Sequence, residues 1–272
     1  MLSFAQSQGE CMFLKAESNI REMYLDYRTH TLEQMMLDYY DVTIQLLSES
    51  KEFNPYEQKW KEYDILLGKC LCRLGELEMY INIRSSKENY TYATELLKEV
   101  EIGVDLESNV MKLMFDVLLG NEIEGLDSII ESYSLRINDL EIEKDIYLKN
   151  TIALIEYRSG NLSEALRWFR LVREIDCEDN EMALYYQIRS LTDYSDCLSS
   201  VGWIEESLYV MGEAIKKLNV LLNKGYLPQI IGFVYYSWGV VASAFYDYDE
   251  AINSYKQAIN YMTDIYGEDC VE

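Results

Sequence analysis

The sequence has 272 residues, of which 48 are acidic and 24 basic, giving a formal net charge of −24. This charge argues against direct nucleic-acid binding, which needs cations that displace counterions, and against binding to anionic membranes. It favours basic partners instead. Two prolines and thirteen glycines are too few for the turns of a sheet protein of this size, so long helices with short connections are predicted.

Turn signals recur along the chain at a nearly constant interval. Gly75, Gly120, Gly160 and Gly202 are separated by 45, 40 and 42 residues, and equal steps reach His30 and Tyr246. A second set of breaks lies half-way between them, at 53–55, 102–103, 138–139, 177–180 and 224–228. We therefore predict about twelve helices in six antiparallel pairs, joined by short connections. The pairs turn near residues 30, 75, 120, 160, 202 and 246.

The strength of the repeat increases along the chain. Residues 1–55 are periodic only, and they predict a divergent helix pair around His30. Residues 56–136 form weaker repeats, in which Leu67-Gly68 followed by Gly75 has the spacing of a first helix. Residues 137–267 form clear repeats. No linker or change of composition divides the chain, so one domain over residues 1–272 is predicted.

In the last three pairs, small residues recur twelve positions apart on the two helices. Such residues allow two helices to cross closely, with a bulky side chain one turn later. The small pairs are Ala153 with Ala165, Ser195 with Ser207, and Gly239 with Ala251, followed by Phe169, Met211 and Tyr255.

This pattern resembles the tetratricopeptide repeat (TPR), whose signature is W-x2-L-G-x2-Y followed by A-x3-F. The matching residues are Trp238-Gly239 with Ala251 and Tyr255, and Gly160 with Ala165 and Phe169. The period exceeds the 34 residues of that family and is similar to the long-repeat arrays of kinesin light chains and bacterial signalling-peptide receptors. The resemblance implies an all-α, right-handed α-solenoid that binds proteins or peptides on a concave face.

In such arrays the first helix of each pair lines the groove. Carrying this register onto the sequence selects side chains that alternate around the packed positions, and ordinary exposed helix positions are the alternative for each. The candidates are Asn150, Leu154, Tyr157, Arg158, Arg189, Asp193, Asp196, Phe233, Tyr236 and Val240. An asparagine there both donates to and accepts from a peptide backbone.

No catalytic, cofactor or metal site is predicted. The one histidine, His30, lies in a predicted turn, and Cys70 and Cys72 point in different directions on a helix. Phosphate-binding glycine loops are absent, and the acidic clusters suit helix N-termini. The chain is therefore not expected to be an enzyme, and its six cysteines are read as reduced thiols of a cytoplasmic protein.

One segment has the length of a membrane span, because residues 225–246 contain no charged side chain. Pro228 and the repeat register argue against a span, and the N-terminus has no signal-like pattern. No membrane association is expected.

The leading functional hypothesis is a protein- or peptide-binding scaffold or receptor whose partner has net positive charge. The alternative is an acidic inhibitor or immunity protein that mimics nucleic acid and blocks a basic partner. A mimic should carry a stripe of carboxylates, whereas a receptor groove should mix aromatic residues with charges of both signs.

The last helix, predicted at about 248–266, carries apolar residues over a wide arc. Since terminal repeats need a cover, we expect a homodimer or hetero-complex through this C-terminal repeat. The expected assembly edge consists of Ile252, Tyr255, Ile259 and Met262.

Overall fold

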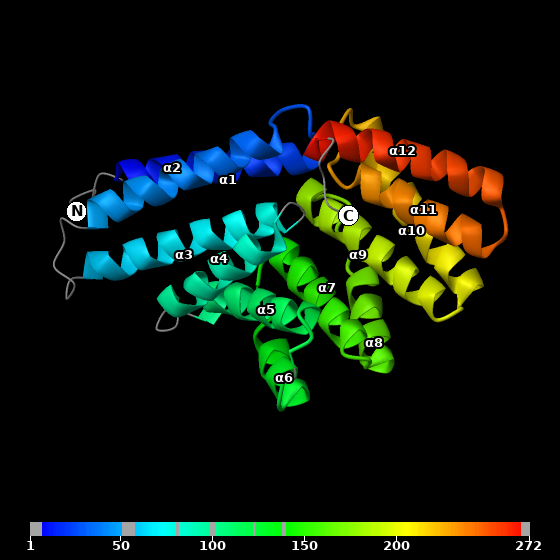
Figure 1. Cartoon of the computed structure of the whole chain (residues 1–272), viewed down its shortest axis with the longest axis horizontal. Coiled ribbons are helices and arrows are strands. Elements are labelled where there is room, and N and C mark those ends of the chain that lie inside the picture. Colours follow the sequence, from blue (N-terminus) through cyan, green and yellow to red (C-terminus); the bar gives the residue numbers. More distant parts are fainter. Residues whose placement is uncertain are drawn as a thin grey trace. The chain divides into compact units, whose positions relative to one another are not determined.

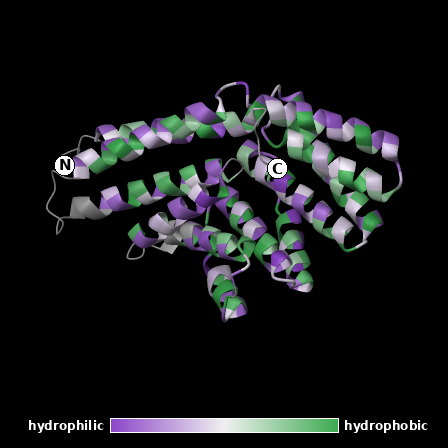
Figure 2. Cartoon of the chain, viewed as in Figure 1, coloured by the Kyte–Doolittle hydropathy of each residue, from purple (hydrophilic) through white to green (hydrophobic). Residues whose placement is uncertain are grey.

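The computed structural model describes residues 7–50, 58–79, 82–97, 102–121, 123–137 and 140–267. Within these ranges the regular structure consists of helices, without a strand, which confirms the predicted all-α class (Figure 1). Apolar and polar residues share most helices, as expected where each helix buries one side (Figure 2). The helices are α1 (Gln8–Leu25), α2 (Leu32–Ser50), α3 (Gln58–Glu78), α4 (Ile83–Leu96), α5 (Ile102–Leu118), α6 (Leu126–Ile137), α7 (Ile142–Arg158), α8 (Leu162–Arg173), α9 (Glu181–Ser200), α10 (Ile204–Asn223), α11 (Ile231–Ala244) and α12 (Tyr248–Tyr266).

The chain divides into two compact units. Unit 1 comprises residues 1–22, 30–115 and 271–272, and unit 2 comprises residues 23–29 and 116–270. One domain over residues 1–272 stays a prediction, and the units are described separately below.

Five of the six predicted turns separate the helices of a pair. The exception is Gly75, which lies inside α3, so the prediction of a turn there was wrong. A Cβ atom at Gly75 would lie 2.7 Å from the ring of Tyr90 on α4, so this glycine permits a close helix crossing. The predicted breaks at 53–55 and 138–139 lie outside the described residues, and the one at 102–103 falls on the first residues of α5.

Unit 1 contains a buried polar network beside its helix crossings. The Tyr39 hydroxyl, fully buried on α2, donates to Glu17 Oε1 on α1 over 2.7 Å. Arg73 on α3 donates to Glu17 and to Glu76, each over 3.0 Å. These bonds offset part of the cost of burying the charged groups, although Glu76 Oε1 is buried without a hydrogen-bond partner among the described residues.

Two of the three predicted close crossings of unit 2 show direct contacts between the paired helices. The Ser195 and Ser207 hydroxyls each donate to the other residue's carbonyl, over 3.1 and 2.9 Å, across α9 and α10. A Cβ atom at Gly239 would lie 2.6 Å from the Tyr255 ring, so α11 and α12 pack closely at this residue, one turn beyond Ala251. Helices this close need small side chains at the contact.

Four turns of unit 2 share a left-handed residue. Gly120, Gly160 and Gly202 have φ angles of 73°, 87° and 84°, and Tyr246 has 64°. Glycine adopts this conformation freely, whereas a side chain there is strained. Tyr246 is 79% exposed, so burial does not compensate for the strain.

The uncharged stretch at 225–246 forms a turn followed by α11. Pro228 and Gln229 are buried in the turn, where Gln229 Oε1 accepts a hydrogen bond of 2.6 Å from the Tyr185 hydroxyl. Helix α11 has 14 residues. Among the described residues, none of the helices combines the length and the apolar character that crossing a membrane requires.

Candidate binding site

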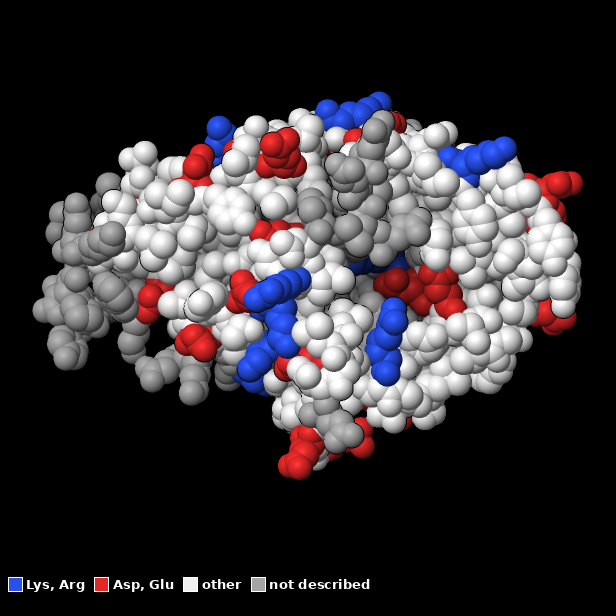
Figure 3. Space-filling model, viewed as in Figure 1, with Lys and Arg blue, Asp and Glu red and all other residues white. Residues whose placement is uncertain are grey.

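Helices α7, α9 and α11 are the first helices of successive pairs in unit 2, and α9 contacts both of the others. We call the surface that they present the first-helix face. In Figure 3, acidic side chains gather over α9 with basic side chains beside them. All predicted groove residues except the buried Asn150 are at least partly exposed: Leu154, Tyr157, Arg158, Arg189, Asp193, Asp196, Phe233, Tyr236 and Val240.

Four side chains from the three helices form two hydrogen-bonded pairs, which together we call the acceptor cluster. Asn150 Nδ2 on α7 donates to Asp193 Oδ2 on α9 over 2.8 Å. The Ser237 hydroxyl on α11 donates to Asp196 Oδ2 over 2.7 Å. Asp193 and Asp196 lie three residues apart and therefore on one side of α9. The cluster links three consecutive repeats.

Two oxygen atoms of the cluster lack a hydrogen-bond donor. Asn150 is 5% exposed, and its Oδ1 atom is buried with no hydrogen-bond partner among the described residues. The Oδ1 atom of Asp196 is likewise buried and without a partner there. Each such group costs about 1–3 kcal/mol relative to a satisfied one. Unpaired buried acceptors at a surface formed by three helices mark a candidate site for a donor.

Burial also changes the protonation of the two acids. It raises the pKa of Asp196 to about 7, and Asp193 contributes to the increase whereas the Ser237 hydrogen bond opposes it. Burial likewise raises the pKa of Asp193, although Arg189, the Asn150 hydrogen bond and Arg158 act in the opposite direction. The two arginines therefore offset only part of the effect of burial on the pKa of Asp193.

Aromatic residues flank the cluster. The Tyr157 hydroxyl on α7 and the Ser200 hydroxyl on α9 share a hydrogen bond of 2.5 Å. Tyr236 on α11 is 44% exposed, with its ring centroid 5.8 Å from that of Tyr255. Phe233 packs edge-on against Tyr266 of α12, so part of its ring is directed toward the second helix of its pair.

Sequence reasoning missed Ser237 and Ser200. The hydrogen bonds from Asn150 to Asp193, Tyr157 to Ser200 and Ser237 to Asp196 join residues 43, 43 and 41 positions apart. These separations equal one repeat, so polar residues spaced by the repeat period were the available signal. Ser237 lies in the uncharged stretch at 225–246, next to the predicted groove residue Tyr236, and was not among the candidates.

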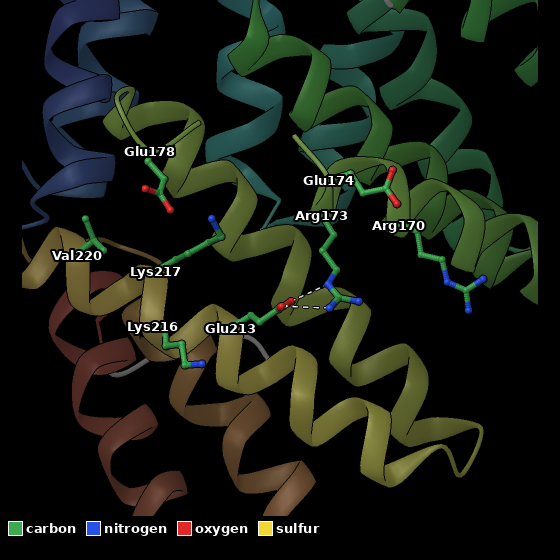
Figure 4. Close-up of a pocket in the computed structure, with 8 residues that line it drawn as sticks. All are labelled: Arg170, Arg173, Glu174, Glu178, Glu213, Lys216, Lys217 and Val220. Atoms are coloured by element: carbon green, nitrogen blue, oxygen red, sulfur yellow. Dashed lines mark hydrogen bonds and ion pairs between the residues drawn. The ribbon is translucent and has the colours of Figure 1, made fainter. Parts of the chain in front are cut away.

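A second feature of unit 2 is an open pocket of about 650 Å³ on the second helices α8 and α10 (Figure 4). We call it the second-helix pocket. Arg173 donates to both carboxylate oxygens of Glu213, over 2.7 and 3.1 Å. Figure 4 shows this pair in the middle of the pocket, with Lys217 extending towards Glu178. The other lining residues are Arg170, Glu174, Lys216 and Val220.

The expected assembly edge is exposed in part. Ile252 and Ile259 on α12 are 52% and 59% exposed. Tyr255 and Met262 face α11 instead, where Cβ atoms at Gly239 and Gly232 would lie 2.6 and 3.0 Å from them. Polar residues such as Asn253 and Lys256 surround the two isoleucines in the sequence and are exposed too. The apolar part of this edge is therefore narrower than the sequence pattern indicated.

The described residues contain no group of three or more histidine, cysteine or acidic side chains that could hold a metal ion. His30 lies 3.5 Å from Glu22, near the turn where the sequence placed it. Cys70, Cys72, Cys177 and Cys197 are buried thiols, and burial raises the pKa of Cys177 and Cys197 to about 11. Thiols with raised pKa values are poor nucleophiles near neutral pH.

Comparisons with protein-family models, with curated proteins and with solved structures find no match to this chain.

Proposed function

We propose that this chain is a TPR-like, right-handed α-solenoid that binds a segment of a partner protein along the first-helix face. The observation that carries this proposal is the acceptor cluster, in which three consecutive first helices jointly bury acceptors that lack donors. A bound segment has backbone N–H groups and side chains to supply, and rows of helices in repeat arrays form extended binding surfaces.

The composition of the face favours a receptor over a nucleic-acid mimic. Arg158 and Arg189 act on Asp193, so the acids do not form an uninterrupted stripe. Tyr157 and Tyr236 add aromatic area, which is typical of anchoring positions at interfaces. The mixture of both signs with aromatic residues is what a groove receptor is expected to carry.

Selection from a displayed library of random peptides on the purified chain tests this proposal. We expect enriched peptides whose binding is weakened at least about tenfold by Tyr157→Ala with Tyr236→Ala, because truncation of true anchors costs more than about 1 kcal/mol each. Arg170→Ala with Lys216→Ala, in the second-helix pocket, is the control. A library that yields no binder contradicts the proposal, as does binding that only the control pair abolishes.

The chain acts in the cytoplasm, where its thiols stay reduced. The five cysteines among the described residues, none of them in a disulfide, support this location.

The chain forms a homodimer or hetero-complex through α12. The exposed Ile252 and Ile259 support this assembly. Light scattering at tens of micromolar should give a dimer mass for the unmodified chain, unless the edge binds another protein. Ile252→Asp with Ile259→Asp should give monomers of unchanged helical content, and a monomeric unmodified chain contradicts the homodimer.

A further inference from the structure

We infer that the acceptor cluster is the specificity pocket of the first-helix face and that it receives a basic side chain, arginine or lysine, of the bound segment. This inference rests on the proposed function and deepens it, because it states which residue the groove selects.

The first step is a deficit of donors. Asn150 uses its Nδ2 group on Asp193, and Ser237 uses its hydroxyl on Asp196. The Oδ1 atoms of Asn150 and Asp196 then remain, both buried and both unpartnered among the described residues. A ligand that fits must bring N–H groups and no additional acceptors. Ammonium and guanidinium groups have only donors.

The second step is charge. Two carboxylates lie one turn apart on α9, and burial raises the pKa of both even though Arg158 and Arg189 act on Asp193. The hydrogen bonds that these carboxylates accept come from neutral donors, Asn150 and Ser237, so the ionised acids have no hydrogen-bonded cation among the described residues. An anionic group would increase this imbalance, and a neutral donor would leave it unchanged. A cation corrects it and forms charge-assisted hydrogen bonds, which are about twice as strong as neutral ones.

The third step is burial. Solvent does not reach either unpartnered oxygen, so folding has already removed water from them. A side chain that displaces a neighbour and reaches these atoms gains hydrogen bonds without a further dehydration cost on the protein side. Acidic groups open to water would provide much less discrimination, because solvent weakens their interactions.

The second-helix pocket provides an internal reference on the same unit. It also contains acidic side chains, Glu174, Glu178 and Glu213, but Glu213 is paired with Arg173 and the pocket is open. Glu174 and Glu178 are exposed. General attraction of a cation to a chain of net charge −24 would involve these acids as much as those of the acceptor cluster.

The experiment uses four libraries of short random peptides with blocked ends, each with one fixed central residue: arginine, lysine, leucine or glutamate. Affinities are measured by fluorescence anisotropy at about 0.15 M salt, where the Debye length is about 8 Å and long-range attraction is screened. The proteins are the unmodified chain, Asp193→Asn with Asp196→Asn, Asp196→Asn alone, and the control Glu174→Gln with Glu178→Gln. The double variants each remove two negative charges, and circular dichroism checks their folding.

We expect the unmodified chain and the control to bind the arginine and lysine libraries at least about tenfold more tightly than the leucine library, a factor that corresponds to about 1.4 kcal/mol. The preference should fall to within about twofold in the double asparagine variant and to an intermediate value in Asp196→Asn. Peptide binding without a basic preference overturns the inference and leaves the proposed function intact. So does a preference that persists without the two acids or that the control also abolishes. If no library binds, the proposed function itself fails, and this inference fails with it.

Discussion

On the first-helix face of unit 2 two oxygen atoms, from Asn150 and Asp196, are buried without a donor, whereas in the second-helix pocket the charged groups are open to solvent and one pair is satisfied. Asp196 keeps a carboxylate oxygen without a partner, but Glu213 receives two hydrogen bonds from Arg173. Both regions contain acids and bases, so composition does not separate them. The difference in burial and in partners does, and for this reason the proposed binding surface is the first-helix face and not the second-helix pocket.

The largest effect is expected from Asp196→Asn. The folded-state pKa of about 7 exceeds the ordinary value of 3.8, so the folded state binds more protons between these values. Stability should therefore fall as the pH rises from about 4 to about 7 and stay low above that range. The substitution should stabilise the chain by on the order of 2 kcal/mol at pH 8 and by little at pH 4. Urea denaturation at pH 4 and pH 8 measures this change in the free energy of unfolding.

Glu174→Gln in the second-helix pocket is the matched change for that experiment. Because Glu174 is exposed, we expect a change within about 0.5 kcal/mol at either pH. If Asp196→Asn and Glu174→Gln shift stability equally at pH 8, the contrast between the two regions is wrong.

A second prediction compares two glycines, one on a first helix and one on a second helix. Gly239→Ala places a Cβ atom 2.6 Å from the Tyr255 ring and should destabilise the chain by at least about 1 kcal/mol. Gly212→Ala on α10 meets no atom within 4 Å and should stabilise it by about 0.5–1 kcal/mol. Thermal unfolding should give shifts of opposite sign. A Gly239→Ala variant at least as stable as the unmodified chain would show that the α11–α12 crossing is not close.

A third prediction concerns the turns that join first to second helices. Tyr246 has a φ angle of 64° where the three preceding turns of unit 2 have glycine. Tyr246→Gly should therefore stabilise the chain by about 1 kcal/mol, while Gly202→Ala should destabilise it by a similar amount. Chemical denaturation of the two variants measures both changes, and a loss of stability in Tyr246→Gly would show that the tyrosine side chain contributes packing.

The smallest effect is expected from Glu213→Gln in the second-helix pocket. The Arg173 and Glu213 side chains are 29% and 26% exposed, so the pair should contribute less than about 1 kcal/mol. The contribution should decrease further at 1 M salt, where the Debye length is about 3 Å. Denaturation at low and high salt measures it, and a large loss independent of salt would instead place this pair in the core.

Helical periodicity and small-residue spacing predicted much of the fold. The Ser195–Ser207 crossing and the separation of α7 from α8 at Gly160 followed from them. The turn predicted at Gly75 was wrong because glycine occurs both in turns and at close helix contacts. The neighbouring sequence does not distinguish these two uses. The groove register brought together Asn150, Asp193 and Asp196, but the unpartnered oxygens depend on side-chain conformations that no spacing rule encodes.

The repeat-spaced hydrogen bonds of unit 2 also affect how it unfolds. Repeat arrays lose cooperativity when the interfaces between repeats are weak. Here the part-buried hydrogen bonds from Asn150 to Asp193 and from Ser237 to Asp196 connect each of these first helices to the next. Fraying α11 would leave the Asp196 carboxylate with neither of its oxygens paired, so local opening at one end carries a cost for the neighbouring repeat. Hydrogen exchange should therefore report α7, α9 and α11 as one cooperative segment with a common opening free energy.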